Sequence, residues 1–405
     1  MASDTTSSRR AGEMPEALLT DELIASMSKR AGTQLRIEHS TNNEEATRIA
    51  VAKFAAGIGD INPLWTDAEY AQSSPYGARV APPSFFIGCF SGIQFGWPGL
   101  GSFHNLTRVT FGKPVYVGDT VNATCTYDGF TGPRPSNFAG NMVTDLFTNR
   151  YANQHGEELA QIHWEVVNFE RSAAKEKTEK KSTSGGGPTL PHVWDEAELE
   201  RIEAQVLAEA PRGATPRYIE DVKVGDHVDT LTKGPIGLTD EIAFVVGGGT
   251  PIPRLSAHAV ALHSYAKHPA WSFRDPETGA QEPIYSVHYN VHAARAMGVG
   301  YPYDVGFQRQ AWQIHHLSHW CGDAGWIKSC ESRYRRFVFL SDVVELSGTV
   351  TGIRVDEDGE HVVDIETRAV NQRGEDCMPG KATVALPSRA DAEAGAPSPA
   401  ARRAR

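Results

Sequence analysis

A carboxylate and an amide stand together in the string GDINP, where Asp60 and Asn62 precede Pro63. Proline disfavours helical geometry in the residue before it, so the chain should leave the preceding helix in an extended conformation at Asn62. A loop of this kind could present Asp60 to a water molecule as a general base. The same string is also ordinary turn chemistry, so by itself it predicts a turn as readily as a site.

His288 offers a second group for acid–base chemistry, in the string SVHYNVHAARAMGVG. Imidazole titrates near neutral pH, so it can take a proton from water and return one to carbon. Gly306 follows eighteen positions later. The alternative for His288 is a partly buried structural histidine.

The string GDINPLWTDAEYA resembles the hydratase motif of the MaoC-like, R-specific enoyl-CoA hydratase family, G-D-x-N-P-x-H-x-D. PYGARVAPPSF, which follows it, resembles the version found in FAS1-like dehydratase domains. The resemblance covers nearly the whole chain between its two tails. It implies an α+β double hotdog, in which each half wraps an antiparallel sheet around a central helix. In that family the Asp and His of the motif hold and activate water, and a later glycine N–H polarises the thioester carbonyl.

The first half departs from this pattern at two positions. Trp65 stands where the motif has its histidine, and Pro83 stands eighteen positions later, where the family has its glycine. Proline has no N–H to donate, so an oxyanion hole at that position is excluded. We therefore expect the first lobe to bind the acyl chain or coenzyme A and the second lobe, with the matching histidine and glycine, to carry the chemistry.

The second half lacks the carboxylate five residues before His288, where Pro283 stands. Glu282, next to that place, is the first candidate for a replacement, and Asp275 is a weaker one. Asp60 reaching across from the first lobe is the third. The resemblance then implies that His288 is the acid and base, Glu282 its partner, Gly306 the oxyanion donor and Asn290 a positioning group.

The resemblance implies reversible conversion of a 2-enoyl-CoA to a 3-hydroxyacyl-CoA, with R stereochemistry. Coenzyme A would enter as part of the substrate, and no separate cofactor is expected. Arg309, Arg335 and Arg336 form the best basic patch for its phosphates, and a solvated strand face is the alternative. Two other functions stay open: an acyl-CoA thioesterase, and a non-catalytic acyl-CoA-binding subunit, because neither lobe holds a complete Asp–His pair.

Histidines are concentrated in the second half, and His292 lies one turn after His288. His315 or His316, with His319, has a helical spacing that can converge on a metal ion. No acidic or cysteine residue completes a recognisable ligand set in the sequence, so we predict no functional metal.

The two halves carry the same markers in the same order, about 220 residues apart, which indicates duplication of one domain. Asp119 and Asp342 each end a turn between strand-like runs, and Asn153-Gln154 and Asn371-Gln372 each precede a Gly-Glu turn. A helix is expected before the strands of each half, within residues 44–60 in the first and, with Thr239 as its N-cap, from 238 in the second. The predicted segments are a disordered start at 1–16, a hotdog at 17–170, a linker at 171–192, a second hotdog at 193–388 and a disordered tail at 389–405.

Composition limits the partners of the chain. Its 405 residues carry a formal net charge of −11, which argues against non-specific binding to nucleic acid. No apolar run is long enough for a membrane span, and the five scattered cysteines suit a reducing compartment. We expect a soluble, cytoplasmic protein that binds an acyl-CoA thioester and pairs as a homodimer or with a partner hotdog subunit.

Overall fold

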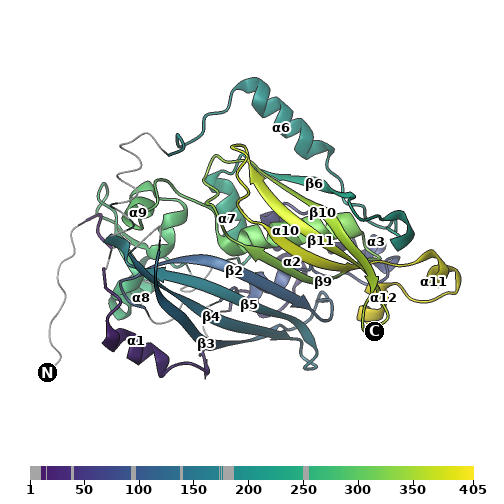
Figure 1. The fold of residues 1–405 in the computed structure, drawn as a ribbon, viewed down its shortest axis with the longest axis horizontal. Coiled ribbons are helices and arrows are strands. Elements are labelled where there is room, and N and C mark those ends of the chain that lie inside the picture. The colour runs from purple at the N-terminus through teal and green to yellow at the C-terminus, as the bar shows by residue number, and fades with distance from the viewer. Residues whose placement is uncertain are drawn as a thin grey trace.

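The computed structural model describes residues 11–14, 16–37, 41–92, 97–136, 140–172, 174, 176, 187–249 and 255–405. A single ten-stranded sheet forms its centre, with the strand order β1-β3-β4-β5-β2-β9-β12-β11-β10-β6 (Figure 1). The first five of these strands come from the first half of the chain and the other five from the second half. The two halves join where β2 pairs antiparallel with β9. This topology confirms the predicted α+β double hotdog.

Each half supplies five strands to the sheet and its own helices. The strands of the first lobe are β1 (Thr33–Gln34), β2 (Gly101–Phe111), β3 (Asn122–Pro135), β4 (Asn141–Ala152) and β5 (Glu158–Phe169). Those of the second lobe are β6 (His227–Lys233), β9 (Trp326–Arg333), β10 (Val344–Val355), β11 (His361–Asn371) and β12 (Gly380–Ala385), with a separate hairpin of β7 (Ser272–Arg274) and β8 (Gln281–Pro283). The helices are α1 (Asp21–Ser28), α2 (Arg48–Ile58), α3 (Ala68–Gln72), α4 (Phe85–Cys89), α6 (Glu196–Ala208), α7 (Leu238–Val246), α8 (His258–Lys267), α9 (Val291–Ala296), α10 (Gly306–Cys321), α11 (Arg389–Glu393) and α12 (Pro399–Ala404).

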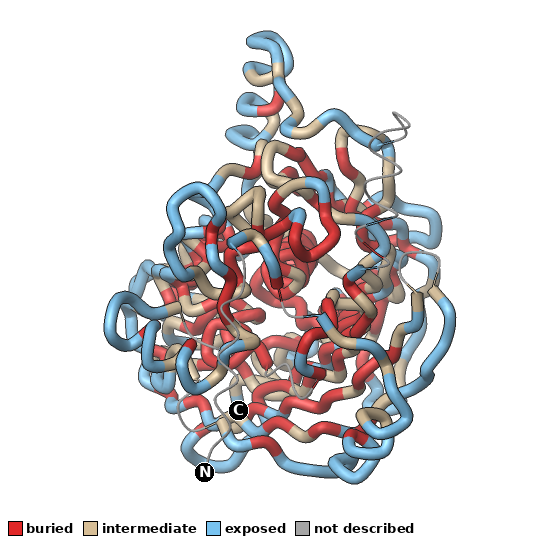
Figure 2. Tube along the Cα trace, turned by 90° about the vertical axis from the view of Figure 1, so that its left-hand side faces the viewer, coloured by how far each residue is buried: buried red, intermediate tan, exposed pale blue. Residues whose placement is uncertain are grey.

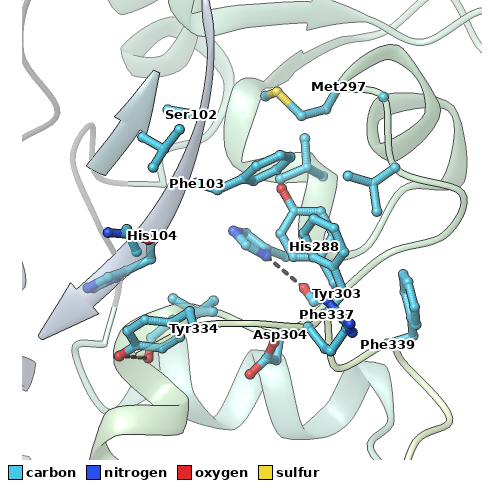
Figure 3. A pocket seen from close by; sticks show the side chains of 18 of the residues that line it. Ser102, Phe103, His104, His288, Met297, Tyr303, Asp304, Tyr334, Phe337 and Phe339 are labelled. Atoms are coloured by element: carbon cyan, nitrogen blue, oxygen red, sulfur yellow. Dashed lines mark hydrogen bonds between the residues drawn. The ribbon is translucent and has the colours of Figure 1, made fainter. Parts of the chain in front are cut away.

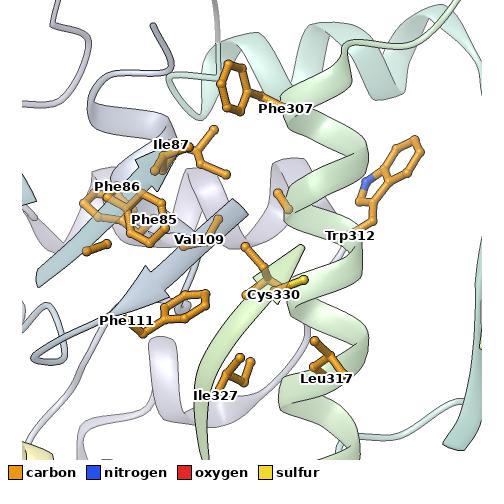
Figure 4. Close-up of a cluster of buried hydrophobic side chains, with 14 of the residues drawn as sticks. Phe85, Phe86, Ile87, Val109, Phe111, Phe307, Trp312, Leu317, Ile327 and Cys330 are labelled. Carbon is orange, nitrogen blue, oxygen red and sulfur yellow. The ribbon is translucent and has the colours of Figure 1, made fainter. Parts of the chain in front are cut away.

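The central helices of the two lobes differ in length. α10 has 16 residues and lies against β6, β9 and β10, and all of its residues except Gly306 and His319 are buried. α4, which follows Pro83 in the first lobe, has only 5 residues, all buried. In Figure 2, the buried stretches of the chain lie in the interior of the molecule. Apolar side chains around both helices form one core that the lobes share (Figure 4). Its members drawn in Figure 4 include Phe85, Phe86, Val109 and Phe111 from the first lobe and Trp312, Leu317, Ile327 and Cys330 from the second.

The predicted duplication has a counterpart in matching side-chain contacts. In the first lobe, Asp119 accepts from the backbone N–H of Tyr116 (2.8 Å) and from Gln154 Nε2 (2.8 Å). In the second, Asp342 accepts from the Phe339 N–H (2.9 Å) and from Gln372 Nε2 (2.8 Å). The paired markers therefore serve one purpose: each Asp closes a turn and ties it to the Asn-Gln turn beside it.

The helices before the motifs pack against one another across the lobes. α2 begins at the N-cap Thr47 and ends at Gly59, which adopts a left-handed conformation (φ 68°). A Cβ at Gly57 would lie 2.7 Å from the Ala243 carbonyl oxygen, so only glycine lets α2 approach α7 this closely. The N-cap of α7 is Gly237, and Thr239 is instead inside the helix. The predicted cap at Thr239 was therefore wrong, because the Asp240 carboxylate binds the Gly237 N–H (2.6 Å) and starts the helix earlier.

The C-terminal segment also differs from the expectation. In place of a disordered tail, residues 389–405 contain α11 and α12, whose Ser388 and Ser398 caps accept from the backbone of the first turn. Arg403 of α12 binds Glu360 (2.7 Å), which anchors this segment on the second lobe. The predicted start at 1–16 and linker at 171–192 lie largely outside the described residues. None of the described helices has both the length and the apolar character needed to cross a membrane.

Candidate active site

A pocket of about 1290 Å³ lies between the lobes, and both contribute to its lining. The first lobe supplies β2 and β5, and the second supplies the 3-10 turn Ile284–His288, the residues after α9 and the start of α10. Figure 3 shows His288 in the middle of the pocket, with β2 passing along one side. Aromatic rings make up much of the wall: Phe103, Phe169, Tyr303, Phe337 and Phe339.

The backbone carbonyl of Tyr303 fixes the state of the His288 ring. His288 Nδ1 lies 2.7 Å from that oxygen (Figure 3). Because a carbonyl can only accept, Nδ1 must carry the ring proton, which leaves a lone pair on Nε2 when the ring is neutral. Burial lowers the pKa of His288 to about 4, so the ring is neutral near pH 7. His288 is therefore prepared to accept a proton at Nε2.

Gly306 lies at the start of α10 and lines the same pocket. The N–H of the first residue of a helix has no acceptor within the helix, and the helix dipole adds positive potential there. A Cβ at this position would lie 2.7 Å from His104 Nδ1, so the close approach of β2 requires glycine. Two of the residues predicted for the chemistry, His288 and Gly306, thus meet in one pocket.

His104, on β2 of the first lobe, is a pocket residue that the sequence did not single out. Its Nε2 lies 2.6 Å from Thr107 Oγ1, and its ring packs 4.3 Å from the ring of Tyr334. The Tyr334 hydroxyl donates to the carbonyl oxygen of Gly306 (2.9 Å). Burial lowers the pKa of His104 to about 3, so this ring is also neutral. In the sequence, His104 stands out only as a polar residue within a strand-like run. That pattern does not reveal that β2 contacts α10.

The predicted carboxylate partner is not in the pocket. Glu282 accepts from the Tyr289 hydroxyl (3.3 Å), and neither residue is among those that line the cavity. Asp275, the weaker candidate, accepts from Asn290 Nδ2 (2.7 Å). Asn290 in turn caps α9 through the N–H groups of the next turn. Both ends of the Asn290 amide are thus occupied: the oxygen caps α9 and the nitrogen binds Asp275 in the β7–β8 hairpin. These contacts support the chain beside His288.

The acids that do line the described pocket are Asp304 and Glu375, and arginines bind both. Asp304 pairs with Arg309, whose Nε donates at 2.7 Å and whose Nη2 also donates. Arg309 is 3% exposed and further donates to the Arg336 carbonyl (3.0 Å). Arg309, predicted to bind coenzyme A phosphates, lines the pocket, and its guanidinium is held there by internal contacts with Asp304 and the Arg336 carbonyl. Glu375 accepts from Arg373 Nε (3.1 Å).

Exposed arginines border the pocket. Arg335 and Arg336, predicted for phosphate binding, both line it and both are exposed. Arg295 of α9 is a third, which the sequence did not single out. Arg336 has Glu375 at 3.8 Å, and the other two reach solvent. Three guanidinium groups at the edge of an aromatic cavity could receive phosphates while the cavity receives an apolar chain.

Asp60 lies elsewhere, in contact with the far end of α10. Its Oδ1 is 3.5 Å from His315 Nε2 and 3.4 Å from His319 Nε2. Gly306 is nine residues before His315 on that helix, or roughly 14 Å at 1.5 Å per residue. The structure thus does not bring Asp60 to His288. Burial by itself would raise the pKa of Asp60, but the adjacent imidazoles hold it below its usual range.

Comparisons with known proteins agree with this architecture. The family model for the FAS1-like, dehydratase domain region matches residues 36–162. A UPF0336 protein of Streptomyces avermitilis is 30% identical over 114 residues, which are 26% of this chain and 73% of that protein. A UPF0336 protein of Streptomyces coelicolor is 29% identical over 110 residues, 25% of this chain and 70% of that one.

Two solved structures match across both lobes. A MaoC-like dehydratase covers 89% of this chain and 99% of its own, with a TM-score of 0.59 and 16% identity. A putative MaoC domain protein dehydratase from Chloroflexus aurantiacus covers 89% and 96%, with a TM-score of 0.55 and 16% identity. At this identity the likeness shows the fold. The chain therefore belongs to the family of the UPF0336 proteins, with a FAS1-like dehydratase region at residues 36–162 and the double-hotdog fold of the MaoC-like dehydratases.

Proposed function

We propose that the protein is a cytoplasmic hydro-lyase that interconverts a 2-enoyl-CoA and a 3-hydroxyacyl-CoA in the pocket around His288. The observation that carries the proposal is the pair formed by the His288 ring, held by the Tyr303 carbonyl (2.7 Å), and the N-terminus of α10 at Gly306. They supply a proton acceptor and an oxyanion donor in one cavity.

In the hydration direction, a water molecule attacks C3 of the enoyl thioester while His288 Nε2 takes its proton. The electrons of the double bond move toward the thioester carbonyl, and the Gly306 N–H stabilises the charge on its oxygen. The imidazolium of His288 then gives the proton to C2. One imidazole thus serves as both base and acid, and the proton balance closes without a second carboxylate.

The low pKa of His288, about 4, leaves the ring unprotonated near pH 7, but it makes the imidazole a weaker base and the imidazolium a stronger acid. A weak base removes a proton from water less readily, but its imidazolium returns the proton to carbon readily. In the dehydration direction, the neutral ring removes the C2 proton of a 3-hydroxyacyl thioester. The negative charge that builds up near the ring during either reaction favours the imidazolium and raises the effective basicity of His288.

The wall of the pocket indicates where each part of the substrate lies. An apolar acyl group fits the aromatic side near Phe103, Phe337 and Phe339. The phosphates of coenzyme A fit the exposed side chains of Arg295 and Arg335. His104 lies against Gly306 and would position the thioester between the lobes.

The test is loss of the enoyl-thioester absorbance with a panel of 2-enoyl-CoA substrates, followed in parallel with release of free thiol. Consumption of the enoyl band without thiol release supports the hydro-lyase, and thiol release from saturated acyl-CoA would instead indicate a thioesterase. Tight binding of the substrates without either reaction would indicate the non-catalytic binding subunit. His288→Gln, compared with His292→Gln outside the pocket lining, separates the site from the rest of the protein.

A further inference from the structure

A second cluster of ionisable side chains lies where the two lobes meet, at the opposite end of α10 from the pocket. Asp60 comes from the turn after α2, in the first lobe, and His315 and His319 come from the last turns of α10. Their facing atoms, Asp60 Oδ1 and the two Nε2 atoms, are 2.8, 3.4 and 3.5 Å apart. The side chains of Asp60 and His315 are fully buried, and that of His319 is 10% exposed.

These distances match a metal-ligand set. Zn²⁺ binds histidine nitrogen and carboxylate oxygen at about 2.0–2.2 Å, so two ligand atoms of a tetrahedral site lie roughly 3.3 Å apart. Two of the three edges agree with this value, and the third opens by a few tenths of an ångström when a cation replaces the hydrogen bond between the two rings. Histidines four residues apart on one helix present their rings on the same face.

A buried polar atom is left without a partner at this place. Asp60 Oδ2 has no hydrogen-bond partner among the described residues, although the carboxylate is buried. Oδ1 accepts from the Asn62 N–H (3.0 Å), so the turn fixes the carboxylate in position. A buried, unpaired carboxylate oxygen is costly, and a bound cation with its water would satisfy it.

We propose that Asp60, His315 and His319 form a binding site for a divalent transition-metal ion of the Zn²⁺ class, which joins the first lobe to the central helix of the second. Three protein ligands leave the fourth position for water, and the partly exposed His319 gives the ion its way in. The site is separate from the His288 pocket and does not depend on the function proposed there. None of the three residues lines that pocket.

Lys233 is the group that competes with the metal. Its Nζ lies 3.0 Å from His315 Nδ1 and donates to the Ile58 carbonyl (2.8 Å). When His315 binds a metal through Nε2, its ring proton must be on Nδ1, where an ammonium group cannot accept it. Metal binding therefore requires Lys233 to lose a proton or turn away. A side chain that accepts from Nδ1–H should strengthen the site.

The test uses the untagged full-length protein, freed of metal with a chelator and titrated with Co²⁺ and then Zn²⁺. We expect one equivalent of Co²⁺ to give the visible absorption of a four- or five-coordinate ion, and Zn²⁺ to remove it and to raise the Tm. Asp60→Asn and His319→Gln should abolish the absorption, and Lys233→Gln should tighten binding.

His316→Gln is the matched control, because His316 is adjacent on α10 but its Nε2 faces the Asp229 carbonyl (2.6 Å). It should keep the Co²⁺ spectrum. The proposal is overturned if the wild-type protein binds no stoichiometric Co²⁺, or if folded His319→Gln, checked by circular dichroism, gives the same spectrum as the wild type.

Discussion

His288 Nδ1 lies 2.7 Å from the backbone carbonyl oxygen of Tyr303, fifteen residues later in the chain. This contact does for His288 what a carboxylate does in many acid–base pairs: it selects the tautomer and holds the ring plane. Burial lowers the pKa of the ring to about 4, and the hydrogen bond to a neutral carbonyl offsets this less than an adjacent carboxylate would. Glu282 does not line the pocket and therefore does not offset the lowering of this pKa by burial.

Replacing His288 tests the acid–base group directly. We expect His288→Gln to lower kcat for hydration by about 10²–10⁴-fold with a small change in KM, because the imidazole acts on the reacting atoms. Steady-state kinetics with a 2-enoyl-CoA checks this. Unchanged kcat would remove His288 from the mechanism.

The pH profile of the reaction should report the same group. The folded pKa of His288 is about 4, below its ordinary value of 6.5, so kcat/KM should stay level from neutral pH and fall as the pH drops through about 4. The unfolded chain binds this proton at higher pH than the folded chain. The contribution of His288 to stability is therefore complete above about 6.5 and is lost as the pH falls toward 4.

Urea unfolding of the wild type and His288→Gln at several pH values separates the contribution of His288 to stability from the contributions of the other titrating groups. The difference in free energy of unfolding should be constant above pH 6.5 and should change in favour of the variant at lower pH. A difference that does not depend on pH would contradict the assigned pKa.

Gly306→Ala tests the approach of β2 to α10. The new Cβ would meet His104 Nδ1 at 2.7 Å, so one of the two must move and the oxyanion N–H with it. We expect activity to fall by about 10–10²-fold, somewhat less than the complete loss of an oxyanion donor costs. Gly300→Ala is the control, because Gly300 lines the same pocket and a Cβ there meets nothing within 4 Å. Equal activities of the two variants would count against the oxyanion role.

Arg335→Gln tests the binding of coenzyme A phosphates. The side chain is exposed at the pocket, so its loss should raise KM about 2–5-fold with little effect on kcat. The increase in KM should be smaller at high salt, because salt screens the attraction between the guanidinium and the phosphates. Arg368→Gln is the matched variant, since Arg368 is also exposed but pairs with Asp376 outside the pocket lining. The assignment fails if a KM increase is the same for both variants.

The duplicated turns should differ in their contribution to stability. Asp342 binds Arg373 at 2.6 and 2.7 Å in addition to Gln372, whereas Asp119 has no arginine at the corresponding place among its described contacts. We expect Asp342→Ala to lower the free energy of unfolding by about 3 kcal/mol, because it leaves a partly buried charge without its partner. Asp119→Ala should cost about 1–2 kcal/mol. Urea denaturation of both variants checks the order.

The sequence by itself determined the architecture of this protein and the lobe that keeps a histidine and a glycine at the motif spacing. Strand alternation, the paired Asp and Asn-Gln markers and the positions of His288 and Gly306 are local patterns, and a local pattern needs only the residues next to it. The loss of the motif histidine and glycine in the first lobe could be recognised for the same reason. Trp65 has no imidazole and Pro83 has no N–H, and both are properties of the residue type.

Tertiary structure decided which of these groups meet. The sequence does not reveal whether Glu282 or a backbone carbonyl lies beside His288. It also does not reveal that the guanidinium of Arg309 binds Asp304. Asp60 is more than 250 residues from His315 and His319, so no spacing rule could join a carboxylate to the two histidines. Contacts across the lobes depend on how β2 pairs with β9 and how α2 packs on α10, and that packing is set by the shared core rather than by any motif.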